Sequence, residues 1–100
     1  MKWQNALKDY QLFLKIERGL SKNTIDSYTR DIQKLMHFLD VNEIGFSPIK
    51  IDSSCIQQFI YEIAKKVQPT TQSRVISGLR NFFDYLIFED YRPDNPTDLI

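Results

Sequence analysis

The sequence predicts an all-α domain of four helices that pair as two helical hairpins. Apolar residues recur with helical spacing in four segments, and no segment shows sustained strand-like alternation. The connections within the first and second pairs are short, whereas a longer one separates the pairs. The 100 residues, 42% apolar and 26% charged with three Gly and four Pro, have the composition of one ordinary folded domain.

The first hairpin is predicted from two apolar stripes on either side of Gly19. The first stripe begins at Trp3, and Gly19 is a suitable residue to end that helix. Ser21 is a good N-cap for the second helix, and Leu20 and Ile25 have the spacing of a hydrophobic staple around it. This second helix is expected to reach residue 39.

The second hairpin is predicted after a connection from about residue 40 to residue 52, in which Gly45 and Pro48 act as breakers. Asp52 or Ser53 is expected to cap a third, shorter helix. The inward-facing apolar residues predicted for the four helices are Trp3, Ala6, Leu7, Tyr10, Phe13, Leu14; Ile25, Tyr28, Ile32, Leu35, Met36, Leu39; Ile56, Phe59, Ile60, Ile63, Ala64; and Val75, Leu79, Phe82, Phe83, Leu86.

The fourth helix is expected to start after an interruption at Pro69, with Thr70 or Thr71 as its cap, and to run to about Glu89. The tail Arg92–Ile100 contains two prolines within four residues and must leave helical geometry. We therefore predict a domain over residues 1–90 and, over residues 91–100, the mobile start of an interdomain linker.

The 13 basic and 13 acidic residues cancel in total, but residues of each sign are concentrated in separate segments of the chain. Residues 1–39 carry a net +3 and residues 65–83 a net +4, whereas residues 40–64 and 84–100 carry −3 and −4. A neutral total argues mildly against nucleic-acid binding. The block distribution nevertheless allows a positive surface on a neutral protein.

Several kinds of chemistry lack their motifs here. The sequence has no glycine-rich phosphate loop, no nucleophile elbow and no metal-spaced Cys/His set, so neither a cofactor nor a metal is expected. Cys55 is the single cysteine and His37 the single histidine, which we interpret as an inert thiol and a solvated surface side chain. No apolar run is long enough to cross a bilayer, so a cytoplasmic protein without a membrane partner is expected.

Two polar stripes carry the strongest functional signal. Asn23, Ser27, Arg30 and Lys34 share the face of the second helix opposite its apolar stripe. On the fourth helix Ser73, Ser77 and Arg80 do the same, with Arg74 and Asn81 beside them. Such side chains hydrogen-bond phosphate oxygens and base edges, and helix starts rich in hydroxyl groups favour a phosphate. A solvated helix face with ordinary caps is the simpler alternative.

Two segments resemble a known family. Residues 20–39, LSKNTIDSYTRDIQKLMHFL, are similar to the second-helix motif L-S-x-x-T-x-x-x-Y-x-x-D-[IL] of the N-terminal SAM-like domain of Xer and phage-integrase-type tyrosine recombinases. Residues 70–100 resemble the fourth helix of that domain and the Asn-Pro segment that leads to the catalytic domain. The resemblance covers nearly the whole chain and is least distinctive over residues 40–52.

The resemblance implies two crossed helical hairpins whose second and fourth helices enter the major groove of double-stranded DNA near the strand-exchange point. Arg30 and Arg80 are added from the helical faces, whereas Tyr28 is assigned to the core. Asp26 borders the proposed surface and would repel phosphate. The DNA-binding residues so predicted are Ser21, Lys22, Asn23, Thr24, Ser27, Arg30, Thr70, Thr71, Arg74, Ser77 and Arg80.

The resemblance also implies an intact enzyme that cuts and rejoins DNA through a phosphotyrosine intermediate. Its catalytic residues would lie in a domain beyond residue 100, and this domain's partners would be DNA, that catalytic domain and neighbouring subunits of a tetramer. The alternative is a helical protein-interaction module without DNA contact. Its surface would use the aromatic residues predicted to be exposed, which are Tyr61, Tyr85, Phe88 and Tyr91.

Overall fold

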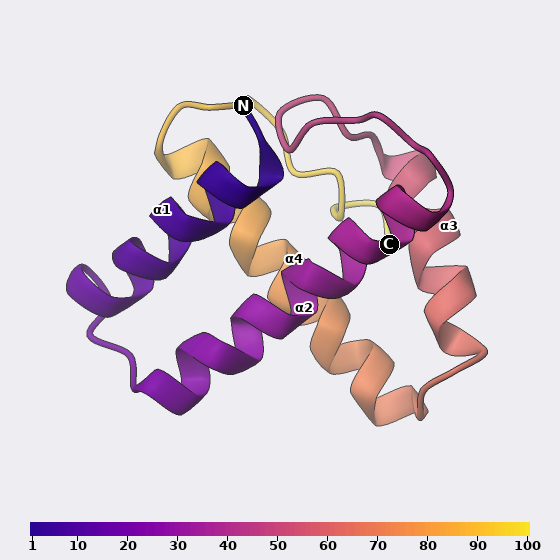
Figure 1. The fold of residues 1–100 in the computed structure, drawn as a ribbon, viewed down its shortest axis with the longest axis horizontal. Helices are drawn as coiled ribbons and strands as arrows, with labels where there is room; N and C mark the ends of the chain where they lie inside the picture. The colour runs from indigo at the N-terminus through magenta and orange to yellow at the C-terminus, as the bar shows by residue number, and fades with distance from the viewer. The chain divides into compact units, whose positions relative to one another are not determined.

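The computed structural model describes all 100 residues, and every regular element in it is a helix (Figure 1). The prediction of an all-α chain with four helices is therefore confirmed. No helix is long and apolar enough to cross a membrane. The helices are α1 (Trp3–Ile16), α2 (Lys22–Val41), α3 (Ser53–Ala64) and α4 (Pro69–Phe88).

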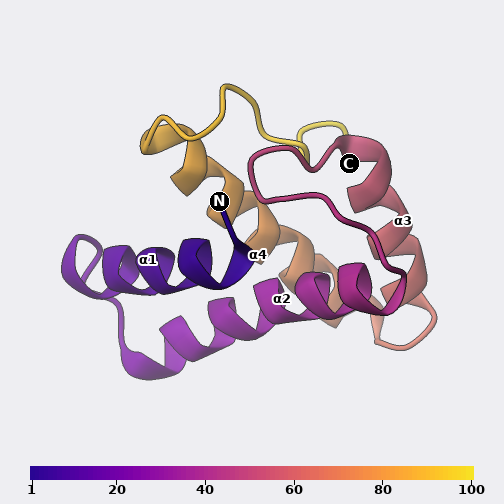
Figure 2. The same ribbon diagram turned by 45° about the horizontal axis from the view of Figure 1, so that its top comes forward.

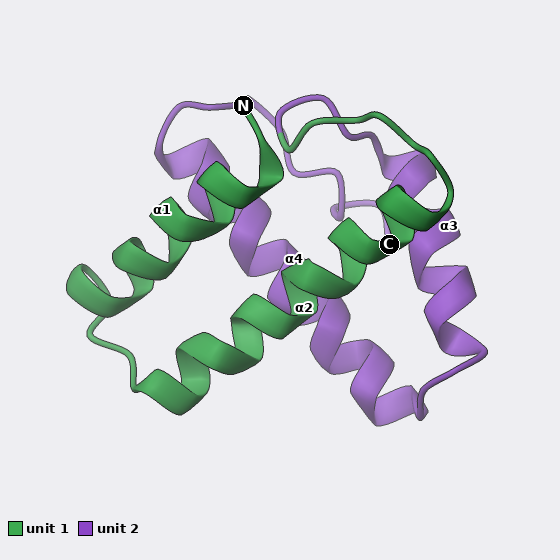
Figure 3. Ribbon diagram, in the orientation of Figure 1, with its two compact units in different colours: residues 1–48 green, residues 49–100 purple.

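The chain divides into two compact units, Met1–Pro48 and Ile49–Ile100, and each holds one of the predicted hairpins (Figure 3). The first unit contains α1 and α2, which the turn at residues 17–21 connects (Figures 1 and 2). Gly19 has a φ of +62° in this turn, the left-handed conformation that a glycine adopts without steric cost. Gln11 of α1 donates a hydrogen bond of 3.1 Å to the hydroxyl of Thr29 on α2.

The first hairpin buries most of the apolar side chains that its periodicity predicts to face inward. Tyr10 and Leu14 of α1 and Ile32 and Leu35 of α2 are fully buried. The predicted inward residues that remain partly exposed are Trp3, Phe13, Ile25, Tyr28 and Met36. Helical spacing therefore identifies the correct face, and position along the helix decides how completely each residue on that face is buried.

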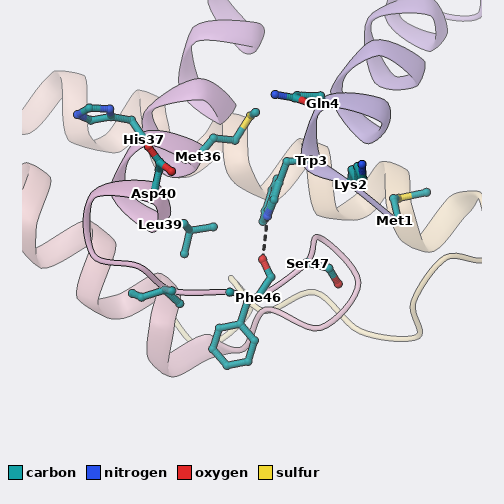
Figure 4. A pocket seen from close by; sticks show the side chains of 12 residues that line it. Met1, Lys2, Trp3, Gln4, Met36, His37, Leu39, Asp40, Phe46 and Ser47 are labelled. Carbon is teal, nitrogen blue, oxygen red and sulfur yellow. Dashed lines mark hydrogen bonds between the residues drawn. The ribbon is translucent and has the colours of Figure 1, made fainter.

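The loop after α2 is fastened to the start of α1. The indole Nε1 of Trp3 donates a hydrogen bond of 2.8 Å to the carbonyl oxygen of Phe46. Figure 4 shows this bond at the edge of an open hollow that residues at the start of α1, the end of α2 and the following loop line together. His37 at its rim is exposed, as predicted, and its imidazole makes no hydrogen bond or ion pair.

The second unit contains α3 and α4, with Asp52 as the N-cap of α3. Its carboxylate accepts a hydrogen bond of 2.9 Å from the amide of Cys55, so one of the two predicted caps is confirmed. The side-chain amide of Gln72 on α4 donates to the carbonyl of Ile60 on α3 at 3.3 Å. All five apolar residues predicted for the inward face of α4 are buried, whereas Ala64, also predicted to face inward, is exposed at the end of α3.

The start of α4 differs from the prediction. Pro69 does not interrupt the chain ahead of the helix but is its first residue, and the N-cap is Gln68, whose side chain makes no capping hydrogen bond. Thr70 and Thr71 therefore lie inside the first turn rather than at the cap. The physical reason is that proline has a φ suited to a helix and lacks the N–H that a first-turn residue would leave unpaired.

The tail after α4 is less exposed than a free linker would be. Arg92, Asn95 and Thr97 are 7%, 5% and 0% exposed, so the chain packs again after α4 ends. The two prolines exclude helix, but they do not exclude docking through side chains. Whether the domain itself ends near residue 90 remains a prediction.

Candidate nucleic-acid interface

The first half of α2 presents a polar surface. We call Ser21, Lys22, Asn23, Thr24, Ser27 and Arg30 the α2 stripe. Five of these residues are exposed and Ser27 is half-buried. The Ser21 hydroxyl accepts a hydrogen bond of 3.3 Å from the amide of Thr24, and the two hydroxyl groups are 3.0 Å apart. The predicted N-cap is thus confirmed, and the same hydroxyl groups face solvent.

The orientation of this stripe follows from the opposite face of α2. Ile32 and Leu35 are fully buried, and Thr29 and Asp31 are also buried on this helix. The Thr29 hydroxyl donates to the Ile25 carbonyl at 2.7 Å while it accepts the bond from Gln11 of α1. The packed face therefore fixes the rotation of α2 and leaves Arg30 exposed. Asp26 is half-buried beside the stripe, so its carboxylate retains access to solvent.

The α4 helix presents the second surface. We call Thr70, Thr71, Arg74, Ser77 and Arg80 the α4 stripe, of which only Thr71 is not fully exposed. No acidic residue lies in the first turn of α4, and no side chain caps it. The amides of Thr70 and Thr71 therefore remain available at the positive end of the helix dipole, where an anion is favoured.

Each stripe contains one exposed arginine whose guanidinium group has no partner. Neither Arg30 nor Arg80 makes a side-chain hydrogen bond or an ion pair. A guanidinium group presents five N–H donors in a fixed planar arrangement that suits phosphate oxygens. These two arginines can therefore bind an anion without first breaking a contact within the protein.

The sequence did not reveal the polar contacts beside Arg80. Asn95, in the tail, donates from its amide nitrogen to the carbonyl oxygen of Arg80 at 3.1 Å and to a carboxylate oxygen of Asp84 at 2.8 Å. The only signal was the Asn-Pro pair at residues 95 and 96, which we interpreted as part of a linker. A docked tail cannot be distinguished from a free one by composition alone.

The aromatic surface of the alternative function is smaller than predicted. Tyr61 and Phe88 are 67% and 70% exposed and Tyr91 is 36% exposed, but Tyr85 is buried, which corrects the prediction for that residue. Tyr85 follows Phe82 by three positions on α4 and lies on the same buried face, with ring centroids 6.5 Å apart. The ammonium group of Lys65 lies 4.8 Å from the ring centre of Tyr61.

Four helices in two hairpins, with polar stripes on the second and fourth, define a small all-α domain of the kind that the resemblance implied. The chain belongs to the family described as phage integrase, N-terminal SAM-like domain, which matches residues 7–90. The match includes α2, α3 and α4 entirely and most of α1.

Similar proteins carry the name tyrosine recombinase XerD. The protein from Haemophilus influenzae is 36% identical over 86 residues, which are 85% of this chain and 28% of that protein. The proteins from Oceanobacillus iheyensis and Staphylococcus aureus are 36% and 32% identical over 92% and 97% of the chain. The chain spans about a third of the length of these relatives, 31% and 33% of the last two. No solved structure matches significantly.

Proposed function

We propose that this domain binds double-stranded DNA through the α2 and α4 stripes as the N-terminal domain of a tyrosine recombinase. The observation that carries the proposal is the exposed, unpartnered arginine in each stripe, Arg30 and Arg80. Both belong to helices that the family motifs cover. Serine, threonine and asparagine around them can hydrogen-bond phosphates and base edges, so the proposed contact is with the major groove beside the site of strand exchange.

The whole protein, under this proposal, cuts and rejoins DNA through a phosphotyrosine intermediate, with its catalytic residues outside these 100. Covalent catalysis of this type preserves the energy of the phosphodiester bond while strands are exchanged. The domain holds and orients the DNA. It also contacts the catalytic domain and neighbouring subunits of a tetramer on two DNA sites. The names of the relatives, tyrosine recombinase XerD, support this wider role.

The distribution of charge along the chain limits the affinity that we expect between the isolated domain and duplex DNA. The segments that contain the two stripes carry net charges of +3 and +4, but the whole chain is neutral. Because distant acidic residues reduce the attraction for DNA, we expect the isolated domain to bind non-specific duplex with a dissociation constant of about 10⁻⁴–10⁻⁵ M at physiological salt.

The test combines NMR with charge reversal. Titration with a duplex should shift amide signals of residues 21–30 and 70–81 and leave residues 41–65 largely unchanged. Arg30→Glu and Arg80→Glu should each weaken binding and reduce the slope of log K against log salt by about 0.9, because each removes one phosphate contact. Lys50→Glu is the matched control: Lys50 is also exposed but lies outside both stripes. Asp26→Asn should tighten binding slightly by removing a charge that repels phosphate.

The alternative function predicts a different result. A protein-interaction module would bind its partner through Tyr61, Phe88 and Tyr91, and reversal of the arginines would leave any salt dependence unchanged. If duplex shifts no signals at millimolar concentration, or if Lys50→Glu weakens binding as much as Arg80→Glu does, the stripes are not a DNA-binding surface.

A further inference from the structure

We infer that Asn95 is a positioning residue for the DNA-binding surface: it holds the Asp84 carboxylate so that Arg80 stays available for phosphate, and this couples docking of the tail to DNA affinity. The inference rests on the proposed function of the α4 stripe. It concerns residues of one compact unit, Ile49–Ile100.

The side chains of Arg80 and Asp84 do not form an ion pair, although their spacing on α4 would allow one. Arg80 and Asp84 are four residues apart on α4, a spacing at which an arginine and a carboxylate commonly form an ion pair. Both residues are exposed, yet no ion pair joins them. Asp84 instead accepts a hydrogen bond of 2.8 Å from the side-chain amide of Asn95.

The side chain of Asn95 has a fixed position. Its amide nitrogen also donates to the carbonyl oxygen of Arg80 at 3.1 Å, so the side chain spans one turn of α4. Its amide oxygen accepts from the amide of Thr97 at 2.9 Å and from the hydroxyl of Thr97. Asn95 is 5% exposed and Thr97 is fully buried. Every hydrogen-bonding group of this side chain is therefore used, and the amide cannot rotate without losing several bonds.

The tail has a second attachment to the same helix. The guanidinium group of Arg92 lies 5.4 Å from the ring centre of Phe83 on α4. The same group donates to one carboxylate oxygen of Asp94 from Nε at 3.3 Å and from an Nη nitrogen at 3.2 Å. With Arg92 and Asn95 both buried, the tail has a defined path along α4.

The Asp84 carboxylate and a DNA phosphate compete for the guanidinium group of Arg80. When the tail leaves α4, Asp84 loses its amide partner and becomes able to pair with the guanidinium group one turn away. A phosphate must then displace that carboxylate before it binds. Asn95 touches neither DNA nor Arg80's guanidinium group in this scheme, so its effect on binding is transmitted entirely through Asp84.

The experiment is a double-mutant cycle in the 100-residue chain, with duplex affinity measured across a salt series. Asn95→Ala should weaken binding about two- to threefold at low salt, the size expected for a competing exposed pair at this spacing. In an Asp84→Asn background the same change should have no effect on affinity, because no carboxylate remains to compete. Hydrogen exchange should show that the Thr97 amide loses protection in both backgrounds.

A second variant guards against simple loss of folding. Asn95→Asp keeps the shape and the acceptor for Thr97 but cannot donate to Asp84 and adds a negative charge. It should therefore weaken binding more in the wild-type background than in the Asp84→Asn background, while circular dichroism shows intact helices. If the double variant with Asp84→Asn stays as weak as Asn95→Ala alone, or if both Asn95 variants bind like the wild type, the inference is wrong. If Arg80→Glu itself leaves binding unchanged, the proposed function of the α4 stripe fails instead.

Discussion

Glu43 and Asp90 follow the ends of α2 and α4, and both have left-handed backbone conformations, with φ of +53° and +61°. After each, the next residue donates back into the helix: Ile44 to the Leu39 carbonyl at 2.8 Å and Tyr91 to the Leu86 carbonyl at 2.9 Å. This is the hydrogen-bonding pattern of a Schellman cap, in which glycine is preferred. Both positions also place a negative charge at the negative end of the helix dipole.

We therefore expect Glu43→Gly and Asp90→Gly to raise the free energy of unfolding, by up to about 1 kcal/mol each. The gain should be smaller at Asp90, because aspartate tolerates the left-handed region better than glutamate does. Urea denaturation measures the change. Glu89→Gly is the control, since Glu89 has a φ of −87° and gains nothing from a glycine. A stabilisation by Glu89→Gly as large as that by Asp90→Gly would contradict the explanation.

Cys55 is 5% exposed, and burial, with a smaller contribution from the Asp52 carboxylate, raises the pKa of its thiol. The folded chain therefore keeps the thiol proton at a pH at which the unfolded chain has released it. It follows that this group's contribution to stability is complete below the ordinary thiol pKa of 9.0 and is lost as the pH rises above it.

The difference in unfolding free energy between the wild type and Cys55→Ala should accordingly shrink as the pH rises above 9.0, at no more than about 1.4 kcal/mol per pH unit. Urea denaturation at several pH values gives this difference. A thiol reagent should react slowly with the native protein and rapidly in denaturant. Equal rates in the two states, or a difference that does not vary with pH, would rule out a buried thiol with a raised pKa.

At the scale of elements, α2 and α4 have the same length, 20 residues, but begin differently. Ser21 caps α2 through the Thr24 amide, whereas Gln68 offers α4 no side-chain cap. A serine, aspartate or asparagine N-cap is typically worth about 1 kcal/mol relative to a residue that cannot cap.

Ser21→Ala should therefore lower the free energy of unfolding by about 1 kcal/mol, and Gln68→Ser should raise it by a similar or smaller amount. Thermal unfolding followed by circular dichroism is sufficient to measure both. Gln68→Ala supplies the reference for an uncapped start of α4. If Gln68→Ser is no more stable than Gln68→Ala, the start of α4 is already satisfied by other means.

For the whole molecule, the prediction concerns covalent chemistry. The chain contains five tyrosines, of which Tyr10 and Tyr85 are buried and Tyr61 is the most exposed. Under the proposed function the nucleophilic tyrosine lies outside these 100 residues, and an activated nucleophile requires a neighbouring base or cation that lowers its pKa. Incubation of this chain with a nicked suicide substrate should yield no protein–DNA adduct on a denaturing gel. An adduct that maps to Tyr28 or Tyr61 would overturn the assignment of the domain.

The sequence by itself determined the elements. Helical periodicity identified four helices and their buried faces, because a side chain's face depends only on its position in a repeat of 3.6 residues. Ser21 and Asp52 were recognised as caps because capping is a local interaction. The exposed residues of the two stripes were also predicted, as the face opposite each apolar stripe. Gln68 was missed at the start of α4, because a proline can either interrupt a chain or begin a helix.

Only the tertiary structure decided the features that depend on contacts between distant segments. Asn95 lies 15 residues from Arg80 and 11 from Asp84, yet its side chain binds both. Trp3 binds the carbonyl of Phe46, 43 residues away. Tyr85 is buried and Ser27 and Thr71 are half-buried, so all three are less exposed than their positions suggested. A polar residue near two prolines satisfies every sequence rule for a free linker, and only the path of the folded backbone brings it to the partners that bury it.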